Sequence, residues 1–321
     1  MVARRTSPGA RFTVVLPGLL FLMLAGLPPA AALIALLLPN LARTASAAPP
    51  WPGDAGVEIG LIGQAGGLPS GYEPSGAAWH AGLGKLVIVG DDGDVSTMDP
   101  DGSNKTTWTP GGDLEAVAIA DPGGTLVYLG REHPDAVLEF DLATGLLTGN
   151  SWDLTPYMTG AINSGLEALT YVDGLFYAGH QGEGNIYVFD LQPAGVVQHL
   201  ATLPPPGGRT DVSGLDFDAA TGTLYAIYDS FNVIVEMTAD GTFLGEYTLP
   251  GDNQEGVAIV KSCPAVEAEV FIAEDPGEVW RYGGYPVACG GDSVPALSLA
   301  SIALFAALAK IVGSDPLTKG V

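Results

Sequence analysis

A short phrase that recurs five times constrains the fold of this 321-residue chain more than any other feature. Each copy begins with polar or acidic residues and continues as an apolar run, and the copies start 40, 52, 46 and 42 residues apart. They read EPSGAAW at 73, DLEAVAI at 113, GLEALTY at 165, DVSGLDF at 211 and NQEGVAI at 253. Self-similarity at such a period is typical of repeat architectures, so the fold is expected to be built from five equivalent units.

Two further apolar runs follow every copy of the phrase, and turn formers such as ATG and DPGG separate them. In the first four repeats a fourth, more polar run comes next, for example TFLGEYTL. Four antiparallel strands per repeat make one propeller blade. The sequence therefore predicts an all-β fold, a five-bladed β-propeller of four-stranded antiparallel blades. A β-sandwich is the alternative, but it gives no reason for five parallel phrases.

The fifth repeat has no fourth run of its own, whereas a strand-like segment, GVEIGLIG at 56–63, precedes the first repeat. We expect this N-terminal strand to complete the last blade, because closing the ring removes an exposed sheet edge. The β-propeller domain is accordingly expected at 48–292.

Both ends of the chain are apolar. Residues 1–47 combine early arginines, a long apolar run and small residues at 45–47, which predicts a signal peptide or an uncleaved N-terminal membrane anchor. Residues 293–321 contain a second apolar stretch, which indicates a sorting or membrane segment, or else a helix packed on the domain. The protein is thus expected to be exported, to the periplasm, the cell surface or the medium, with membrane contact through these terminal segments.

The two cysteines, Cys263 and Cys289, are predicted to form a disulfide in an exported protein. The formal net charge of −24 argues against nucleic acid as a partner, because phosphates would be repelled. It favours a divalent cation, above all Ca²⁺. The alternative is that the charge only keeps an exported protein soluble.

The acids recur at equivalent places in the repeats. In a propeller blade, the first strand begins where the second ends, at one face beside the central opening. Polar side chains, all but one of them with oxygen atoms, occupy both places in every repeat: Glu73, Ser75, Asp113, Glu115, Glu167, Asp211, Ser213, Asn253 and Glu255 at the first position, and Asp91, Asp92, Glu132, His180, Gln181, Asp229, Glu274 and Asp275 at the second. Carboxylates about 4 Å apart repel by roughly 4 kcal/mol at an effective dielectric constant of 20. Such a rim must take up protons, pair with bases or bind cations, and calcium accepts this mixture of oxygens. Alternatively, only some of these residues converge, and the others cap strands or bond to neighbouring blades.

The ordered phrases EPSGAAWHAGLGKLVIVGDDG, DLEAVAIADPGGTLVYLGRE, GLEALTYVDGLFYAGH and DVSGLDFDAATGTLYAIYDS, followed by QEGVAIV and VFIAEDPG, resemble the SdiA-regulated (YjiK-like) family of bacterial propellers. The likeness covers about 56–284 and implies a five-bladed propeller, distantly similar to NHL repeats, with a calcium site. Carried onto this sequence, the implied metal residues are Glu73, Glu115, Glu132, Glu167, Asp211, Asp229, Glu255 and Glu274. The sequence departs from the family at the end of the second strand of the third repeat, where His180-Gln181 replaces an acid.

The leading interpretation is a non-enzymatic, calcium-binding propeller that acts as a binding or scaffold module at the cell envelope. No G-x-S-x-G or H-E-x-x-H motif occurs, so no catalytic residue is assigned. The alternative is a metal-dependent esterase, lactonase or phosphoesterase at the same acidic rim, with His180 or Glu115 as its base. A third interpretation is a structural surface protein whose acids merely provide solubility.

Overall fold

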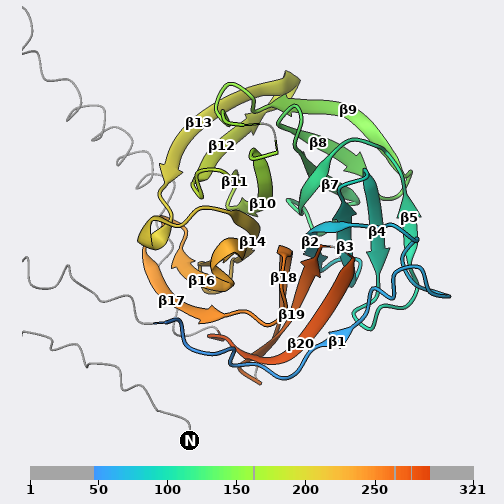
Figure 1. The fold of residues 1–321 in the computed structure, drawn as a ribbon. Helices are drawn as coiled ribbons and strands as arrows, with labels where there is room; N and C mark the ends of the chain where they lie inside the picture. The colour runs from blue at the N-terminus through green and yellow to red at the C-terminus, as the bar shows by residue number, and fades with distance from the viewer. Residues whose placement is uncertain (1–46, 162, 264, 276, 290–321) are drawn as a thin grey trace, which may run out of the picture. The chain divides into compact units, whose positions relative to one another are not determined.

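The computed structural model describes residues 47–289 except 162, 264 and 276. These residues form five four-stranded antiparallel sheets, arranged around a central opening as the blades of a propeller (Figure 1). The predicted fold class is therefore confirmed. The segments predicted as signal or anchor and as C-terminal tail lie outside the described residues, apart from Ala47.

Each blade is one sheet whose strands follow one another from the centre of the ring to its edge (Figure 1). Blade 1 consists of β2 (Pro74–His80), β3 (Lys85–Gly90), β4 (Asp94–Met98) and β5 (Thr106–Trp108). Blade 2 consists of β6 (Leu114–Ala118), β7 (Leu126–Arg131), β8 (Ala136–Asp141) and β9 (Leu146–Asp153). Blade 3 consists of β10 (Leu166–Val172), β11 (Leu175–His180), β12 (Ile186–Gln192) and β13 (Val196–Leu203). Blade 4 consists of β14 (Val212–Asp218), β15 (Thr223–Tyr228), β16 (Val233–Thr238) and β17 (Phe243–Thr248). Within the described residues, three short 3₁₀ helices lie in connections: η2 (Pro193–Gly195), η3 (Pro206–Gly208) and η4 (Asp229–Phe231).

Blade 5 is built from both ends of the described chain. It consists of β18 (Gln254–Ser262), β19 (Glu267–Glu274), β20 (Glu278–Pro286) and, as its outermost strand, β1 (Val57–Glu58). Strand β1 pairs antiparallel with β20, with Val57 opposite Arg281. The predicted closure by an N-terminal strand is confirmed, and the paired part is shorter than the apolar segment that suggested it.

The blades are held together by apolar clusters, one between each pair of neighbouring blades. Successive side chains of a strand point to opposite faces of the sheet, so a middle blade strand packs against both neighbours. In β3, Leu86 and Ile88 face blade 5, whereas Val87 and Val89 face blade 2. Because both faces are buried, the strand is an unbroken apolar run rather than an alternating one.

The innermost strands share one irregularity. Each contains a β-bulge after its first residue, so that the second residue has no partner in the adjacent strand. The next residue is small in every blade because the innermost strands approach closely at this level. A Cβ added to Gly256 would lie 2.7 Å from the Ala77 nitrogen, and one added to Gly76 would lie 2.7 Å from the Ala116 Cα.

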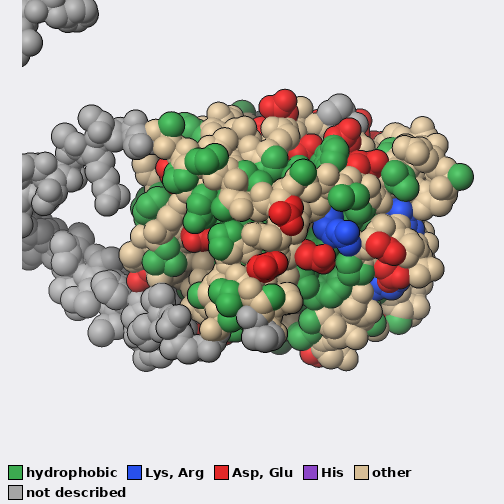
Figure 2. All heavy atoms as spheres, turned by 90° about the horizontal axis from the view of Figure 1, so that it is seen from below, with side chains coloured by type: hydrophobic (Ala, Val, Ile, Leu, Met, Phe, Trp, Pro, Cys, Tyr) green, Lys and Arg blue, Asp and Glu red, His purple; other side chains and the backbone are tan. Residues whose placement is uncertain are grey.

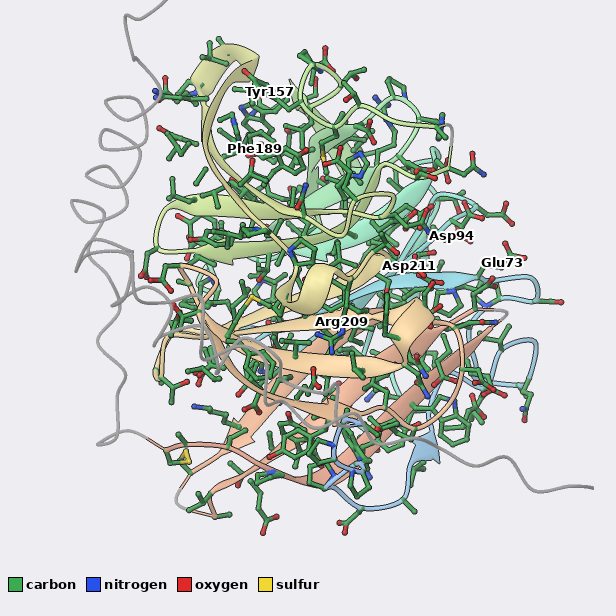
Figure 3. The ribbon with its side chains drawn as sticks, turned by 60° about the vertical axis from the view of Figure 1, so that its left-hand side comes forward. Glu73, Asp94, Tyr157, Phe189, Arg209 and Asp211 are labelled. Carbon is green, nitrogen blue, oxygen red and sulfur yellow. A yellow bond between two sulfur atoms is a disulfide. The ribbon has the colours of Figure 1, made fainter. Side chains whose placement is uncertain are left out.

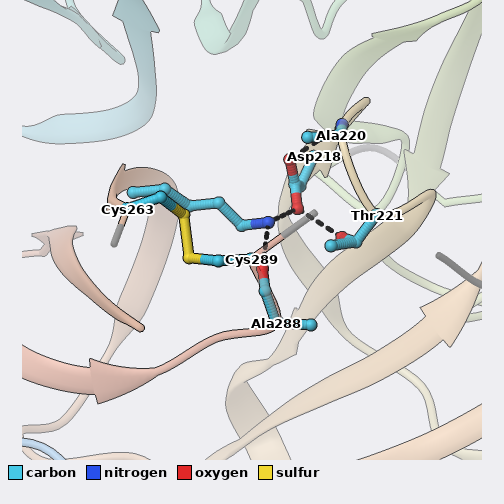
Figure 4. The surroundings of a disulfide bond; sticks show 7 residues. Asp218, Ala220, Thr221, Cys263, Ala288 and Cys289 are labelled. Carbon is cyan, nitrogen blue, oxygen red and sulfur yellow. Dashed lines mark hydrogen bonds and ion pairs between the residues drawn. A yellow bond between two sulfur atoms is a disulfide. The ribbon is translucent and has the colours of Figure 1, made fainter. Parts of the chain in front are cut away.

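A disulfide joins Cys263, after β18, to Cys289 at the C-terminal end of the described chain, with 5.8 Å between the two Cα atoms (Figure 4). Next to it, Lys261 donates to the Ala288 carbonyl at 2.7 Å and pairs with the Asp218 carboxylate of blade 4. The covalent link and the ion pair together attach the last segment to blades 4 and 5.

The structure corrects the prediction of a membrane partner. Among the described residues, no helix is long and apolar enough to cross a membrane. The apolar residues of this part are instead distributed over short strands that are separated by turns. The two terminal segments on which the prediction rested lie at 1–46 and 290–321, outside the described residues.

Candidate functional site

The five bulge residues form a ring in the central channel. They are Ser75, Glu115, Glu167, Ser213 and Glu255. The three glutamates and Ser213 line a narrow cavity together with the small residues that follow them. The cavity has a volume of about 10 Å³ for the centre of a water-sized sphere, which is about the space that one water molecule or ion requires. The carboxylates of Glu115, Glu167 and Glu255 belong to apolar strands, but they are outside the strand pairing and point into a polar channel.

A repeated backbone hydrogen bond brings the polar segments of each blade together at one face of the ring. The N–H of the residue after the second strand donates to the carbonyl of the residue that precedes the first strand, at 2.9 to 3.1 Å. The pairs are Asp91 to Glu73, Glu132 to Asp113, Gln181 to Gly165, Asp229 to Asp211, and Asp275 to Asn253. Figure 3 shows Glu73 and Asp211 on the same side of the propeller. We call this face the mouth of the channel.

Three carboxylates meet at the mouth between blades 1 and 2. Asp91, Asp113 and Glu115 each offer an oxygen atom, and these atoms all lie within 4.8 Å of one another. A side-chain hydrogen bond with Asp113, together with burial and the charges of Asp113 and Glu73, raises the pKa of Asp91 to about 7. Burial, contact with Asp113 and the charge of Asp91 raise the pKa of Glu115 to about 9. Without a cation, this group therefore holds protons at neutral pH.

A second group shares Asp113 with the first. The imidazole Nδ1 of His133 lies 3.1 Å from the Oε2 atom of Glu132 and 3.5 Å from the Oδ2 atom of Asp113. These three side chains also offer ligand atoms within 4.8 Å of one another. The nearby Arg131 directs its Nε to the Pro134 carbonyl at 3.2 Å. Among the described residues, potential metal ligands are therefore most concentrated at the mouth on the side of blades 1 and 2.

Glu167 and Glu255, at the equivalent bulges of blades 3 and 5, add two further carboxyl groups to the channel. Burial raises the pKa of Glu167 well above its usual value, and the charges of Glu115 and Glu255 add to this effect. Burial and the charges of Asp229 and Asp211 raise the pKa of Glu255 to about 8. The effect of Glu115 and Glu255 on the pKa of Glu167 agrees with the three glutamates lining one cavity. Neither Glu167 nor Glu255 belongs to a three-residue ligand group among the described residues.

Other predicted metal residues bond to neighbouring backbone. The Oε1 atom of Glu132 accepts the Gly165 N–H of blade 3 at 2.5 Å, and Asp229 accepts the Gln254 N–H of blade 5 at 2.8 Å. Asp211 accepts the Ser230 N–H at 3.0 Å. These acids lie at the mouth and connect segments there. This is the alternative predicted from the sequence for some of the rim residues, namely that they bond to neighbouring blades.

The structure places Glu274 elsewhere. As the last residue of β19 it pairs with Gln254, whereas the next residue, Asp275, occupies the position equivalent to Glu132 and Asp229. Glu274 is buried and lines an outer cleft of blade 5 with Glu278 and Trp280. Burial and the charge of Glu278 raise its pKa to about 7. Glu274 therefore does not face the channel with the three bulge glutamates.

His180, the predicted base of the enzyme alternative, is buried with both ring nitrogens engaged. Its Nδ1 accepts the Glu183 N–H at 3.2 Å, and its Nε2 lies 3.1 Å from the Thr159 carbonyl oxygen. The ring thus connects two loops and has no free nitrogen for proton transfer.

The eight residues predicted from the sequence to bind metal did not include three members of the two ligand groups, namely Asp91, Asp113 and His133. The first two carried a usable signal, since Asp113 stands where Glu73 and Asp211 stand in their repeats, and Asp91 stands where Asp229 does. The only signal in the sequence for His133 was its position next to Glu132.

Acidic side chains are spread widely over the visible surface in Figure 2, whereas basic ones occur in few places. The negative charge is thus not confined to the mouth. What distinguishes the mouth is the short distance between its carboxylates.

A family model and a solved structure agree with this architecture. The family model described as SdiA-regulated matches residues 195–266. No curated protein matches the chain. The crystal structure of glutaminyl cyclase from Myxococcus xanthus is similar in fold, with a TM-score of 0.51 and 12% sequence identity over 74% of this chain and 97% of that chain. A chain in the crystal structure of a nidogen/laminin complex has a TM-score of 0.43 and 14% identity, over 67% of this chain and 81% of that chain. The predicted resemblance is therefore confirmed, and the chain is a five-bladed β-propeller that carries the SdiA-regulated family pattern at residues 195–266.

Proposed function

We propose that this protein is an exported propeller module that binds one Ca²⁺ ion at the mouth of its channel and acts as a binding or scaffold module at the cell envelope. The observation that carries the proposal is the group formed by Asp91, Asp113 and Glu115, whose oxygen atoms lie within 4.8 Å of one another. Oxygens bound to one calcium ion at 2.3–2.6 Å are at most about 5 Å apart, so the group has the dimensions of a calcium site.

The electrostatics of the mouth support a hard cation. All three groups are carboxylates, the donor type that Ca²⁺ prefers. The pKa of Asp91 is raised chiefly by its hydrogen bond with Asp113 and that of Glu115 chiefly by burial, and the neighbouring carboxylates raise both further. A divalent cation would replace the protons of these carboxyl groups and remove the repulsion. Glu167 and Glu255 line the same channel, and a cation at the mouth would favour loss of their protons as well.

Two features support export. The N-terminal segment has the composition of a secretory signal, and the Cys263–Cys289 disulfide is typical of oxidising compartments. A closed ring with a rigid, charged mouth suits a binding or scaffold module. His180, the base considered for an enzyme, has both nitrogens occupied.

Calorimetric titration of the metal-free protein with Ca²⁺ tests the proposal. We expect one binding event, and a rise in melting temperature that corresponds to about 2.7 kcal/mol when calcium is present at 100 times its dissociation constant. The Glu115→Gln and Asp113→Asn variants should each bind calcium at least about tenfold more weakly, because each loses a charged ligand.

Glu267→Gln is the matched control, because this substitution removes the same charge as Glu115→Gln does. Glu267 is exposed and lies at the end of β19 away from the mouth. The control variant should bind calcium like the unchanged protein. The absence of both a heat of binding and a melting shift would contradict the calcium site, as would equal losses in the control and in Glu115→Gln.

A further inference from the structure

The group of Asp113, Glu132 and His133 is not explained by a calcium site, because Ca²⁺ is bound by oxygen ligands and this group contains an imidazole. We propose that these three side chains bind a first-row transition-metal ion such as Zn²⁺, and that Asp113 bridges it to the calcium ion. Imidazole and carboxylate together suit such an ion. The inference rests on the proposed function only through the shared Asp113.

The distances fit a small metal ion. The Nδ1 atom of His133 lies 3.1 Å from Glu132 Oε2 and 3.5 Å from Asp113 Oδ2. Ligand atoms about 2.1 Å from a tetrahedral zinc ion are about 3.4 Å apart. The three atoms can therefore contact one such ion with little movement of the side chains.

The orientation of Glu132 is fixed in advance. Its side chain is only 3% exposed, and its Oε1 atom accepts the Gly165 N–H of the next blade at 2.5 Å. The other oxygen, Oε2, is thereby turned toward His133. A hydrogen bond that holds the second oxygen of a carboxylate ligand is the usual outer-shell support of a metal site.

The group is also accessible from solvent. Glu132 and His133 line a cleft with a volume of about 450 Å³, together with Thr155 and Thr159. A metal ion bound by three protein ligands at the edge of this cleft would keep one side open, as zinc ions with a water ligand do. The open side would allow the ion to exchange with solvent.

The competing explanation is an ion pair. A protonated His133 would lie between the carboxylates of Glu132 and Asp113 at the same distances, with no metal needed. The two explanations differ in what zinc does to the imidazole of His133, and this difference defines the test.

The experiment is a Zn²⁺ titration of the full chain in saturating Ca²⁺, followed through the side-chain ¹⁵N resonances of histidine. The chain has only 4 histidines, so every imidazole can be followed. We expect the Nδ1 resonance of His133 to shift and those of His80, His180 and His199 to stay. Resonances of His133 that do not respond, or that respond no more than those of exposed His199, would overturn the inference.

Variants separate the two metals. His133→Ala should weaken zinc binding about 100-fold or more and leave calcium binding within about twofold. Glu115→Gln should weaken calcium binding at least about tenfold and leave zinc binding within about twofold. His199→Ala is the control and should bind zinc like the unchanged protein. Equal zinc affinities of His133→Ala and His199→Ala would contradict the zinc site. A missing calcium signal with an intact zinc response at His133 would contradict the proposed function and the bridging role of Asp113, and would leave the zinc site supported. The zinc titration of the unchanged protein tests the inference even if a variant fails to fold.

Discussion

Glu115 shows how a carboxylate can occupy an apolar strand. It stands at the bulge of β6, where Leu114 and Ala116 on either side pair with β7 and Glu115 does not. The extra residue bends the strand and turns its side chain into the channel, while its neighbours pack between blades. The cost of the carboxylate is therefore electrostatic rather than a loss of packing, because it faces the carboxylates of Asp91 and Asp113.

This cost predicts an effect of Glu115→Gln that reverses with calcium. In chelator near pH 8, the variant should be more stable than the unchanged protein by about 1 to 3 kcal/mol, since glutamine needs no proton in this site. In saturating calcium the order should invert, because only glutamate is a strong ligand. Chemical denaturation under both conditions measures the two differences. A variant that is less stable in chelator as well would show that Glu115 stabilises the metal-free fold.

At the scale of elements, the blades were predictable from the sequence because each repeat carries its own strands and turns. The closing strand was predictable because blade 5 lacked one. The site was predictable only in part. Glu274 was grouped with Glu132 and Asp229 by sequence, yet β19 continues one residue further, and a shift of one residue turns a side chain to the opposite face. The approach of His133 to Asp113 depends on the path of two loops, which no repeat pattern encodes.

The disulfide gives a prediction at the same scale. Replacing Cys263 and Cys289 by serine should lower the free energy of unfolding by between about 3 and 4 kcal/mol, as expected for a link that spans 26 residues. Urea denaturation of the variant and of the oxidised protein measures the change. The calcium affinity should stay the same, because the link lies away from the mouth. Equal stability of the variant and the oxidised protein would mean that Lys261 and the strand pairing already hold this segment.

At the scale of the whole molecule, buried acids of the channel and of the blade 5 cleft have pKa values that are all raised. The pKa of Glu115 is about 9, that of Glu255 about 8 and that of Glu274 about 7, against a usual 4.5. Burial is the largest cause for each of them. Between pH 4.5 and these values the folded state binds more protons than the unfolded state does.

Stability of the metal-free protein should consequently be greatest in mild acid and should fall as the pH rises from about 5 to about 9. Saturating calcium should flatten this dependence, since the cation replaces the protons at the mouth. Melting temperatures measured across this range, with calcium and with chelator, give the two curves. Parallel curves would show that the cation does not act on these groups, and a metal-free curve that rises with pH would contradict the raised pKa values.

The pairing of β1 with β20 has a consequence for biogenesis. Strand β1 is synthesised first among the strands, and its partner follows roughly 200 residues later, a delay of roughly 10 to 40 s at ordinary rates of translation. Throughout that interval four blades can assemble, but the ring stays open and both of its edges lack partners. Emergence of residues 278–286 is therefore the event that ends the period of greatest exposure to aggregation and to proteases.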